Sequence, residues 1–158
     1  MGNISGHIAS DSTHGSKATD VRAIGAEVYL LPVTTRMPLK FGPETMTTVT
    51  CARVKLTIRG RDGREAEGWG ETPLSVQWSW PGKLSFAERQ QAMIEFCKRL
   101  AAAWARLELW GHSLEIGYQF QRKILPALVA DFNRARPRDA QMPHLDDQPN
   151  RNRPDRES

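Results

Sequence analysis

Residues 64–73 read Arg-Glu-Ala-Glu-Gly-Trp-Gly-Glu-Thr-Pro, and the character of the chain changes around them. The sequence before this stretch has the pattern of strands, and the sequence after it has the pattern of helices. Glycines on both sides of Trp69 would let another backbone or a ligand come close, because glycine has no Cβ atom. Pro73 has no N–H group to donate to a neighbouring strand, so we expect the strand to end there.

Two runs upstream alternate apolar and polar residues, which is the period-two pattern of a strand. In residues 21–33 the alternating apolar positions are Ile24, Ala26, Val28 and Leu30. In residues 45–59 they are Val54, Leu56 and Ile58. Residues 34–43 lie between the two runs and contain two prolines and a glycine, so they are predicted to form a long loop.

A hairpin is expected after the second run, because residues 60–63 read Gly-Arg-Asp-Gly and an Asp-Gly step suits a tight turn. The stretch from residue 64 would then pair back as a third strand. These features predict an antiparallel meander of three strands with one face to be covered.

The remainder of the chain has helical spacing. Ser85 and Glu88 have the separation of a capping box. Apolar residues recur at helical intervals as far as residue 109, namely Met93, Phe96, Cys97, Leu100, Trp104 and Leu107. We expect Gly111 to end this helix in the left-handed conformation, with His112 as a polar residue at the helix terminus, and Ser113 to cap the next helix.

The second helical run reaches about residue 134, and Pro126 within it is expected to kink it or to split it into two short helices. The prediction is therefore an α+β domain over residues 21–142, with a three-stranded antiparallel meander followed by two or three helices. Residues 1–20 and 143–158 have few bulky apolar residues and are expected to be disordered tails. A chain of 158 residues suits one domain with a core.

Charge and composition argue against several classes of protein. The net charge is +4, but arginines and lysines are spread along the chain, which argues against nucleic-acid binding. No apolar run approaches the roughly 20 residues that span a bilayer, and the N-terminus lacks the pattern of a secretory signal. We therefore expect a cytoplasmic protein without membrane contact. The cysteines and histidines are scattered, so no metal site is predicted.

Three carboxylates, Glu65, Glu67 and Glu71, share one face of the third predicted strand. Such a row is compatible with acid–base chemistry or with metal binding. More often it is solvated or pairs with neighbouring arginines, and we favour that interpretation. No catalytic residue, metal ligand or cofactor is predicted in this chain.

The motif formed by Gly68, Trp69, Gly70 and Glu71 invites comparison with a phosphate-binding loop. It lacks the last glycine of a dinucleotide fingerprint, and no helix begins directly after it. We interpret it as a tight strand exit that packs the tryptophan.

The two predicted loops carry the candidate ligand-binding residues. These are Arg36, Lys40 and Phe41 in the first loop and Gln77, Trp78 and Trp80 in the second. In a three-stranded meander both loops leave the sheet at the same end, where cations and aromatic rings together can bind an acidic small molecule. Alternatively, the tryptophans pack over the sheet edge. The residues alone leave both interpretations open.

The order of these features resembles a known unit. Three strands with a long first loop, the strand exit Gly-Trp-Gly-Glu-x-Pro, a second loop and then helices are similar to the N-terminal capping domain of the enolase superfamily, in its mandelate racemase and muconate lactonizing enzyme branch. The resemblance covers roughly residues 21–142 and rests mainly on residues 53–58, the hairpin and residues 68–71.

The resemblance implies a lid over the mouth of a modified (β/α) barrel, with residues 34–43 and 72–82 as the loops that close the site and set specificity. In the family, the barrel supplies the carboxylates that bind Mg²⁺ and the bases that remove a proton next to a substrate carboxylate. The complete enzymes are racemases, dehydratases or cycloisomerases, so an acidic small-molecule substrate is implied.

A barrel needs about 200 or more residues, and only a short tail follows residue 142. We therefore expect a truncated or split chain that is inactive alone, and whether it counts as an enzyme stays open. Its expected partner is a separate barrel chain or a second copy, bound through apolar helix faces that the barrel would cover. The alternative is a stand-alone α+β module that binds a small ligand or a protein through the Arg/Trp loops.

Overall fold

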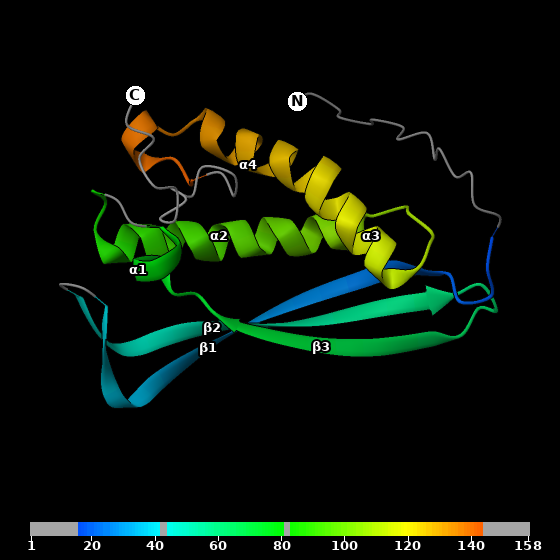
Figure 1. The fold of residues 1–158 in the computed structure, drawn as a ribbon, viewed down its shortest axis with the longest axis horizontal. Coiled ribbons are helices and arrows are strands. Elements are labelled where there is room, and N and C mark those ends of the chain that lie inside the picture. Colours follow the sequence, from blue (N-terminus) through cyan, green and yellow to red (C-terminus); the bar gives the residue numbers. More distant parts are fainter. Residues whose placement is uncertain (1–15, 42–43, 81–82, 144–158) are drawn as a thin grey trace, which may run out of the picture.

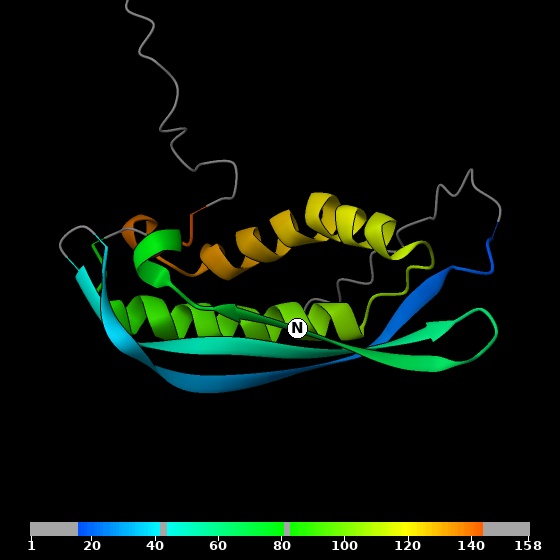
Figure 2. The ribbon, with the colours of Figure 1, turned by 60° about the horizontal axis from the view of Figure 1, so that its bottom comes forward.

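A three-stranded antiparallel sheet with helices on one face forms the architecture of the computed structural model (Figure 1, Figure 2). The structure describes residues 16–41, 44–80 and 83–143. The predicted α+β class, with three strands first and helices after them, is confirmed. The predicted tails lie outside the described residues, apart from residues 16–20 and Pro143.

The strands follow one another in the sheet in the order β1-β2-β3, with β1 at Val21–Phe41, β2 at Glu44–Gly60 and β3 at Glu65–Pro73. The predicted hairpin between β2 and β3 is present. Its Gly63 has a φ of 81°, which glycine adopts without strain. β3 ends at Pro73 as predicted, because proline cannot donate to the ladder.

The prediction of a long loop over residues 34–43 is wrong for residues 34–41, because β1 continues through them, and residues 42–43 lie outside the described residues. β1 pairs with β2 from Val21↔Gly60 as far as Phe41↔Glu44. The register shifts between Thr34 and Leu39, so the proline inside this interval does not have to donate to β2. The segment and its partner strand are also rich in threonine, which favours extended backbone.

β3 is shorter than the two strands beside it, and its last pair is Cys51↔Pro73. The far parts of β1 and β2 therefore continue beyond β3 as a two-stranded hairpin, which we call the arm (residues 32–41 and 44–50). Figure 1 shows the arm bending away from the sheet at the end where α1 (Val76–Ser79) lies.

The segment after β3, predicted as a loop over residues 72–82, contains the single helical turn of α1. The N–H group of Leu74 donates to the carbonyl oxygen of Thr50 at 2.8 Å. This bond keeps the start of the segment beside the arm.

The main helix, α2 (Phe86–Ala105), begins with the predicted capping box. The N–H group of Glu88 donates to Ser85 Oγ at 3.3 Å, and the N–H group of Ser85 donates to Glu88 Oε2 at 3.0 Å. α2 lies over β1 and β2, as Figure 2 shows, and leaves β3 without a helix above it.

α2 ends before the predicted residue 109, and Gly111 is not its left-handed terminus. Gly63 is the only residue with a positive φ in the part of the chain that the structure describes, and Gly111 instead pairs with Val21 in an isolated bridge. The next helix, α3 (Ser113–Gln119), is capped by His112, whose Nδ1 accepts from the N–H group of Leu114 at 3.3 Å. Ser113 was therefore the wrong cap, and the interpretation of His112 as a helix-terminal residue is confirmed.

α3 continues through a π-helical turn, η1 (Phe120–Ile124), into α4 (Leu125–Arg134), and a short 3-10 turn, η2 (Arg138–Ala140), follows. Pro126 lies in the first turn of α4, where a missing N–H group costs least. The predicted split at this proline takes the form of a π-helical turn between two α-helices. No helix among the described residues is long and apolar enough to cross a bilayer.

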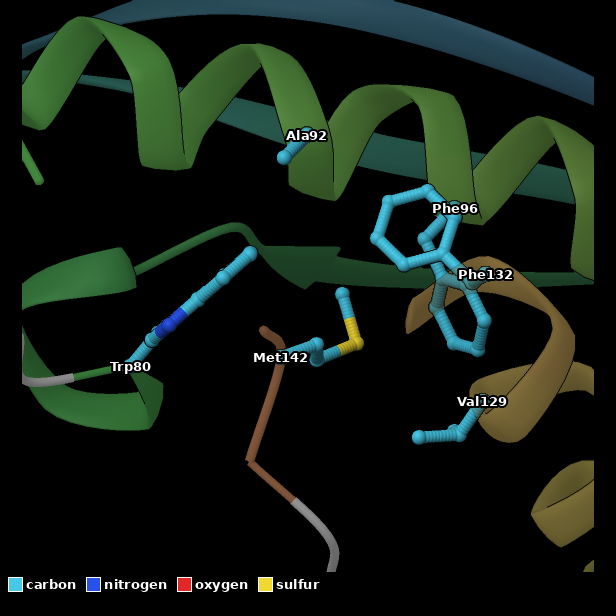
Figure 3. Close-up of a cluster of buried hydrophobic side chains, with 6 residues drawn as sticks. All are labelled: Trp80, Ala92, Phe96, Val129, Phe132 and Met142. Carbon is cyan, nitrogen blue, oxygen red and sulfur yellow. The ribbon is translucent and has the colours of Figure 1, made fainter. Parts of the chain in front are cut away.

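Most of the core lies between the helices. One cluster joins the α1 segment to α2 and α4 and consists of Trp80, Ala92, Phe96, Val129, Phe132 and Met142. Figure 3 shows Met142 between Trp80 and the rings of Phe96 and Phe132, whose centroids are 5.2 Å apart. A second cluster of Leu107, Ile116 and Phe120 joins the segment after α2 to α3 and η1.

Candidate functional site

Two of the predicted ligand-binding residues, Arg36 and Lys40, lie on the arm and are exposed. Apolar side chains between them are exposed as well, because Met37 is 74% exposed and Leu39 is 47% exposed. The arm thus presents cationic and apolar groups together, from a strand rather than from a loop. Phe41 is the last residue of β1, and its side chain lies outside the described part of the chain.

The second predicted group lies in and just after α1. Gln77 is half-buried, and the side chain of Trp78 lies outside the described part of the chain. Trp80 is only 3% exposed and belongs to the first core cluster. Trp80 therefore packs among the helices rather than over the sheet edge, and its ring is not available to a ligand.

Sequence reasoning missed Arg89, a buried residue of α2 that holds the α1 segment in place. Its Nη1 donates to the carbonyl oxygens of Val76 at 3.3 Å and Trp80 at 2.8 Å. The Val76 carbonyl also accepts from the N–H group of Trp80 at 3.0 Å. The Trp80 carbonyl follows the single turn of α1, where no further helical N–H group is available, so a charged donor stabilises it. The sequence does contain one sign of this role, because Arg89 is a cation on the apolar stripe of α2, one turn before Met93.

The arm and the α1 segment lie at the same end of the sheet, as expected for the two predicted loops (Figure 1). The hydrogen bond between Leu74 and Thr50 makes this proximity part of the backbone structure. A ligand or partner at this end would meet the exposed side chains of the arm first, since Trp80 faces inward.

The Gly-Trp-Gly-Glu motif does not form the predicted tight strand exit that packs the tryptophan. A Cβ atom added at Gly68 or Gly70 would meet nothing within 4 Å, so neither glycine serves a close approach among the described residues. Trp69 is 58% exposed, and its ring centroid lies 5.7 Å from that of Tyr29. The tryptophan is not packed at a tight strand exit, because it points to the sheet face opposite the helices.

The carboxylates of β3 pair with cations of β2, which confirms the favoured interpretation of the acidic row. The pairs are Arg53–Glu71 at 2.6 Å, Lys55–Glu67 at 3.4 Å and Arg59–Glu65 at 2.6 Å. The antiparallel register places Glu71 opposite Arg53 and Glu65 opposite Arg59. Glu67 lies opposite Thr57, so its pair with Lys55 is diagonal. These charges therefore form a ladder on the outer face of the sheet.

Glu27 of β1 extends the ladder, because it pairs with Lys55 and accepts a hydrogen bond from the Tyr29 hydroxyl at 2.7 Å. The hydrogen bond from Lys55, and then that from Tyr29, lowers the pKa of Glu27. The hydrogen bond to Glu27 in turn raises the pKa of Lys55 and of Tyr29. All three pKa shifts favour the charged carboxylate, the charged ammonium and the neutral hydroxyl, which are the ordinary forms at neutral pH. The shifts move each pKa away from neutral pH, which does not suit proton transfer there.

Within residues 16–41, 44–80 and 83–143, no group of three or more His, Cys, Asp and Glu side chains could hold a metal ion. Both cysteines are free, and burial raises the pKa of the Cys97 thiol. Cys97 therefore behaves as a small apolar residue on α2.

Comparisons of the chain with protein-family models, with curated proteins and with solved structures give no match. The function has to be inferred from the residues and their arrangement.

Proposed function

We propose that this chain is the lid and specificity domain of a magnesium-dependent enzyme of the mandelate racemase/muconate lactonizing type. Such an enzyme acts on carboxylic acids as a racemase, dehydratase or cycloisomerase, and this chain is inactive without a barrel. The main observation behind this proposal is the arm. Its exposed cations and apolar side chains lie at the same end of the sheet as the α1 segment.

The surface of the arm suits a partner and a carboxylate. Met37 and Leu39 expose apolar area, and grouped apolar side chains on a surface typically mark a contact site. Arg36 and Lys40 supply charge for a carboxylate group. A two-stranded hairpin is only marginally stable by itself, so contact with a barrel would also fix its position.

The carboxylates of the sheet do not fit a magnesium site. Glu65, Glu67 and Glu71 are each paired with a cation of β2, whereas Mg²⁺ needs free oxygen ligands in octahedral geometry. The proposal therefore assigns substrate contact and exclusion of water to this chain, and it assigns the metal and the proton-transferring bases to the barrel. The meander followed by helices agrees with what the family resemblance implies about the fold.

The test mixes the full chain with separately expressed barrel domains of mandelate racemase-type enzymes whose own capping domain has been removed. With MgCl₂ and mandelate in D₂O, we expect exchange of the α-proton only when both proteins are present. Arg36→Gln and Met37→Ser should each lower the exchange rate about tenfold, which corresponds to the loss of one good contact. Arg64→Gln, a control on the far turn whose side chain is also exposed, should change it less than about twofold.

Failure of the chain to associate with any barrel would contradict the lid function. Equal effects of the arm variants and the control would also contradict it, because the arm would then have no special role.

A stand-alone binding module is the second candidate, and one observation favours it. Two hydrophobic clusters close between the chain's own helices, so the domain does not need a barrel to build its core. Such a module would bind an acidic small molecule or a protein through the arm. Binding of small carboxylates to the chain alone, weakened by Arg36→Gln, would favour this candidate over the lid.

Two side chains of α3 support association with a barrel or with a second copy. Leu114 is 77% exposed and Tyr118 is 63% exposed. We propose that this part of α3 contributes to such a contact. We also propose a cytoplasmic location, which rests on the sequence alone.

A further inference from the structure

Two arginine side chains meet one tryptophan ring at the end of the sheet away from the arm. The guanidinium carbon of Arg61 lies 4.0 Å from the ring centroid of Trp110, and that of Arg22 lies 5.4 Å from it. Arg22 belongs to β1, Arg61 to the turn between β2 and β3, and Trp110 to the segment between α2 and α3. Figure 1 shows this turn and the arm at opposite ends of the molecule.

Backbone pairing brings the three segments together. Val21 exchanges hydrogen bonds with Gly111, at 3.0 Å and 3.2 Å, and lies opposite Gly60 in the β1–β2 register. Arg22, Trp110 and Arg61 each follow or precede one of these three residues directly. Their proximity therefore results from regular pairing of the main chain rather than from flexible side chains alone.

The turn that carries Arg61 is itself well determined. The N–H group of Gly63 donates to the carbonyl oxygen of Gly60 at 3.0 Å. The N–H group of Gly60 donates to the carbonyl oxygen of Arg64 at 2.8 Å. Asp62 Oδ1 accepts from the N–H group of Arg64 at 3.0 Å. These bonds hold Arg61 at the tip of the turn, above the tryptophan.

Some arginines at this end of the sheet have an acidic partner, and others do not. Arg59 pairs with Glu65, and Arg64 pairs with Asp62. Arg22 and Arg61, in contrast, form no ion pair with any residue that the structure describes, and the Arg22 Nε–H group is buried without a hydrogen-bond acceptor there. Two positive charges therefore share one aromatic ring without an acidic partner among the described residues.

We propose that Arg22 and Arg61, gathered around Trp110, form a binding site for an oxyanion, the carboxylate or phosphate group of a ligand. An aromatic ring attracts a guanidinium through its face, which leaves the in-plane N–H donors at the edge of the guanidinium for an anion. Carboxylate and phosphate oxygens match those donors in spacing and charge. The site lies apart from the arm and does not depend on the lid function.

The experiment titrates the full chain with inorganic phosphate and, separately, with malonate at constant ionic strength. Nuclear magnetic resonance follows the indole N–H signal of Trp110 and the Nε–H signals of Arg22 and Arg61. We expect saturable shifts of these signals, with Kd in the millimolar range or below for at least one anion. The anion that binds more tightly identifies the phosphate or the carboxylate as the preferred group.

Variants separate a defined site from general attraction to a basic surface. Arg61→Gln lies on an exposed turn and should weaken binding about tenfold without unfolding the chain, and Trp110→Phe, which keeps a ring, should weaken it less. The matched control is Arg64→Gln, which removes the same charge from the same turn but not from the tryptophan. Absence of saturable shifts with both anions, or equal weakening by Arg61→Gln and Arg64→Gln, would overturn the proposal.

Discussion

Arg89 donates a hydrogen bond from its Nη1 atom to the carbonyl oxygen of Trp80, 2.8 Å away, and both residues are buried. The bond joins α2 to Trp80, which follows the last residue of α1 and belongs to the first core cluster. Water cannot readily replace either partner, because both groups are inside the molecule.

Replacing Arg89 by methionine should therefore destabilise the fold. We expect the free energy of unfolding to fall by about 2–3 kcal/mol, because two carbonyl groups lose a charged donor. Urea denaturation followed by circular dichroism measures the loss. The control is Arg106→Met at the exposed end of α2, which should change the free energy by no more than about 0.5 kcal/mol. Equal losses in the two variants would show that the bonds to α1 contribute little.

Ser85→Ala tests the cap of α2. The hydroxyl accepts from the N–H group of Glu88, and its removal should cost about 1 kcal/mol of unfolding free energy. Ser113→Ala is the matched control, because His112 and not Ser113 caps α3, and it should change stability by less than about 0.5 kcal/mol. A larger loss from Ser113→Ala would restore the sequence-based assignment of that cap.

Glu27→Gln tests the pH dependence of the outer sheet face. The hydrogen bond from Lys55 is the main cause that lowers the pKa of Glu27 below its ordinary 4.5. The carboxylate therefore stabilises the fold above that pH, and the contribution disappears as the pH falls through the lowered pKa. We expect the variant to melt below the original chain at neutral pH and the difference in Tm to vanish in acid.

Glu108→Gln provides the control for this series, since Glu108 forms no ion pair with a described residue. Its Tm should follow that of the original chain at each pH. A difference between Glu27→Gln and the original chain that persists unchanged in acid would mean that packing, and not charge, causes it.

Phe132→Ala tests the core between α2 and α4. The ring is buried and contacts Phe96, so its removal should lower the free energy of unfolding by about 3–5 kcal/mol. Leu114→Ala removes an exposed apolar side chain from α3 and should stay within about 0.5 kcal/mol. Thermal or urea unfolding of both variants compares them directly, and similar losses would contradict the position of the core.

Several features of the fold could be predicted because short patterns encode them. The alternation in β1 and β2, the Asp-Gly turn and the Ser85–Glu88 capping box each depend on neighbouring residues and their backbone preferences. The pairing of Glu65 and Glu71 with β2 was also foreseeable, because the antiparallel hairpin sets them opposite Arg59 and Arg53.

The candidate site was predicted less well, because burial depends on which distant segments meet. Trp69 and Trp80 look alike in the sequence, yet the first is exposed on a sheet face and the second is buried under α2 and α4. Proline and glycine in residues 34–43 suggested a loop, but pairing with β2 extended the strand into the arm.

By itself, the sequence determined the order and type of the three strands and of the main helices, since periodicity, turn residues and caps act over a few positions. Only the tertiary structure decided how far β1 and β2 pair, which tryptophan enters the core, and that Arg22 and Arg61 meet at Trp110. Those outcomes depend on packing between segments that are far apart in the chain, and no local pattern specifies such contacts.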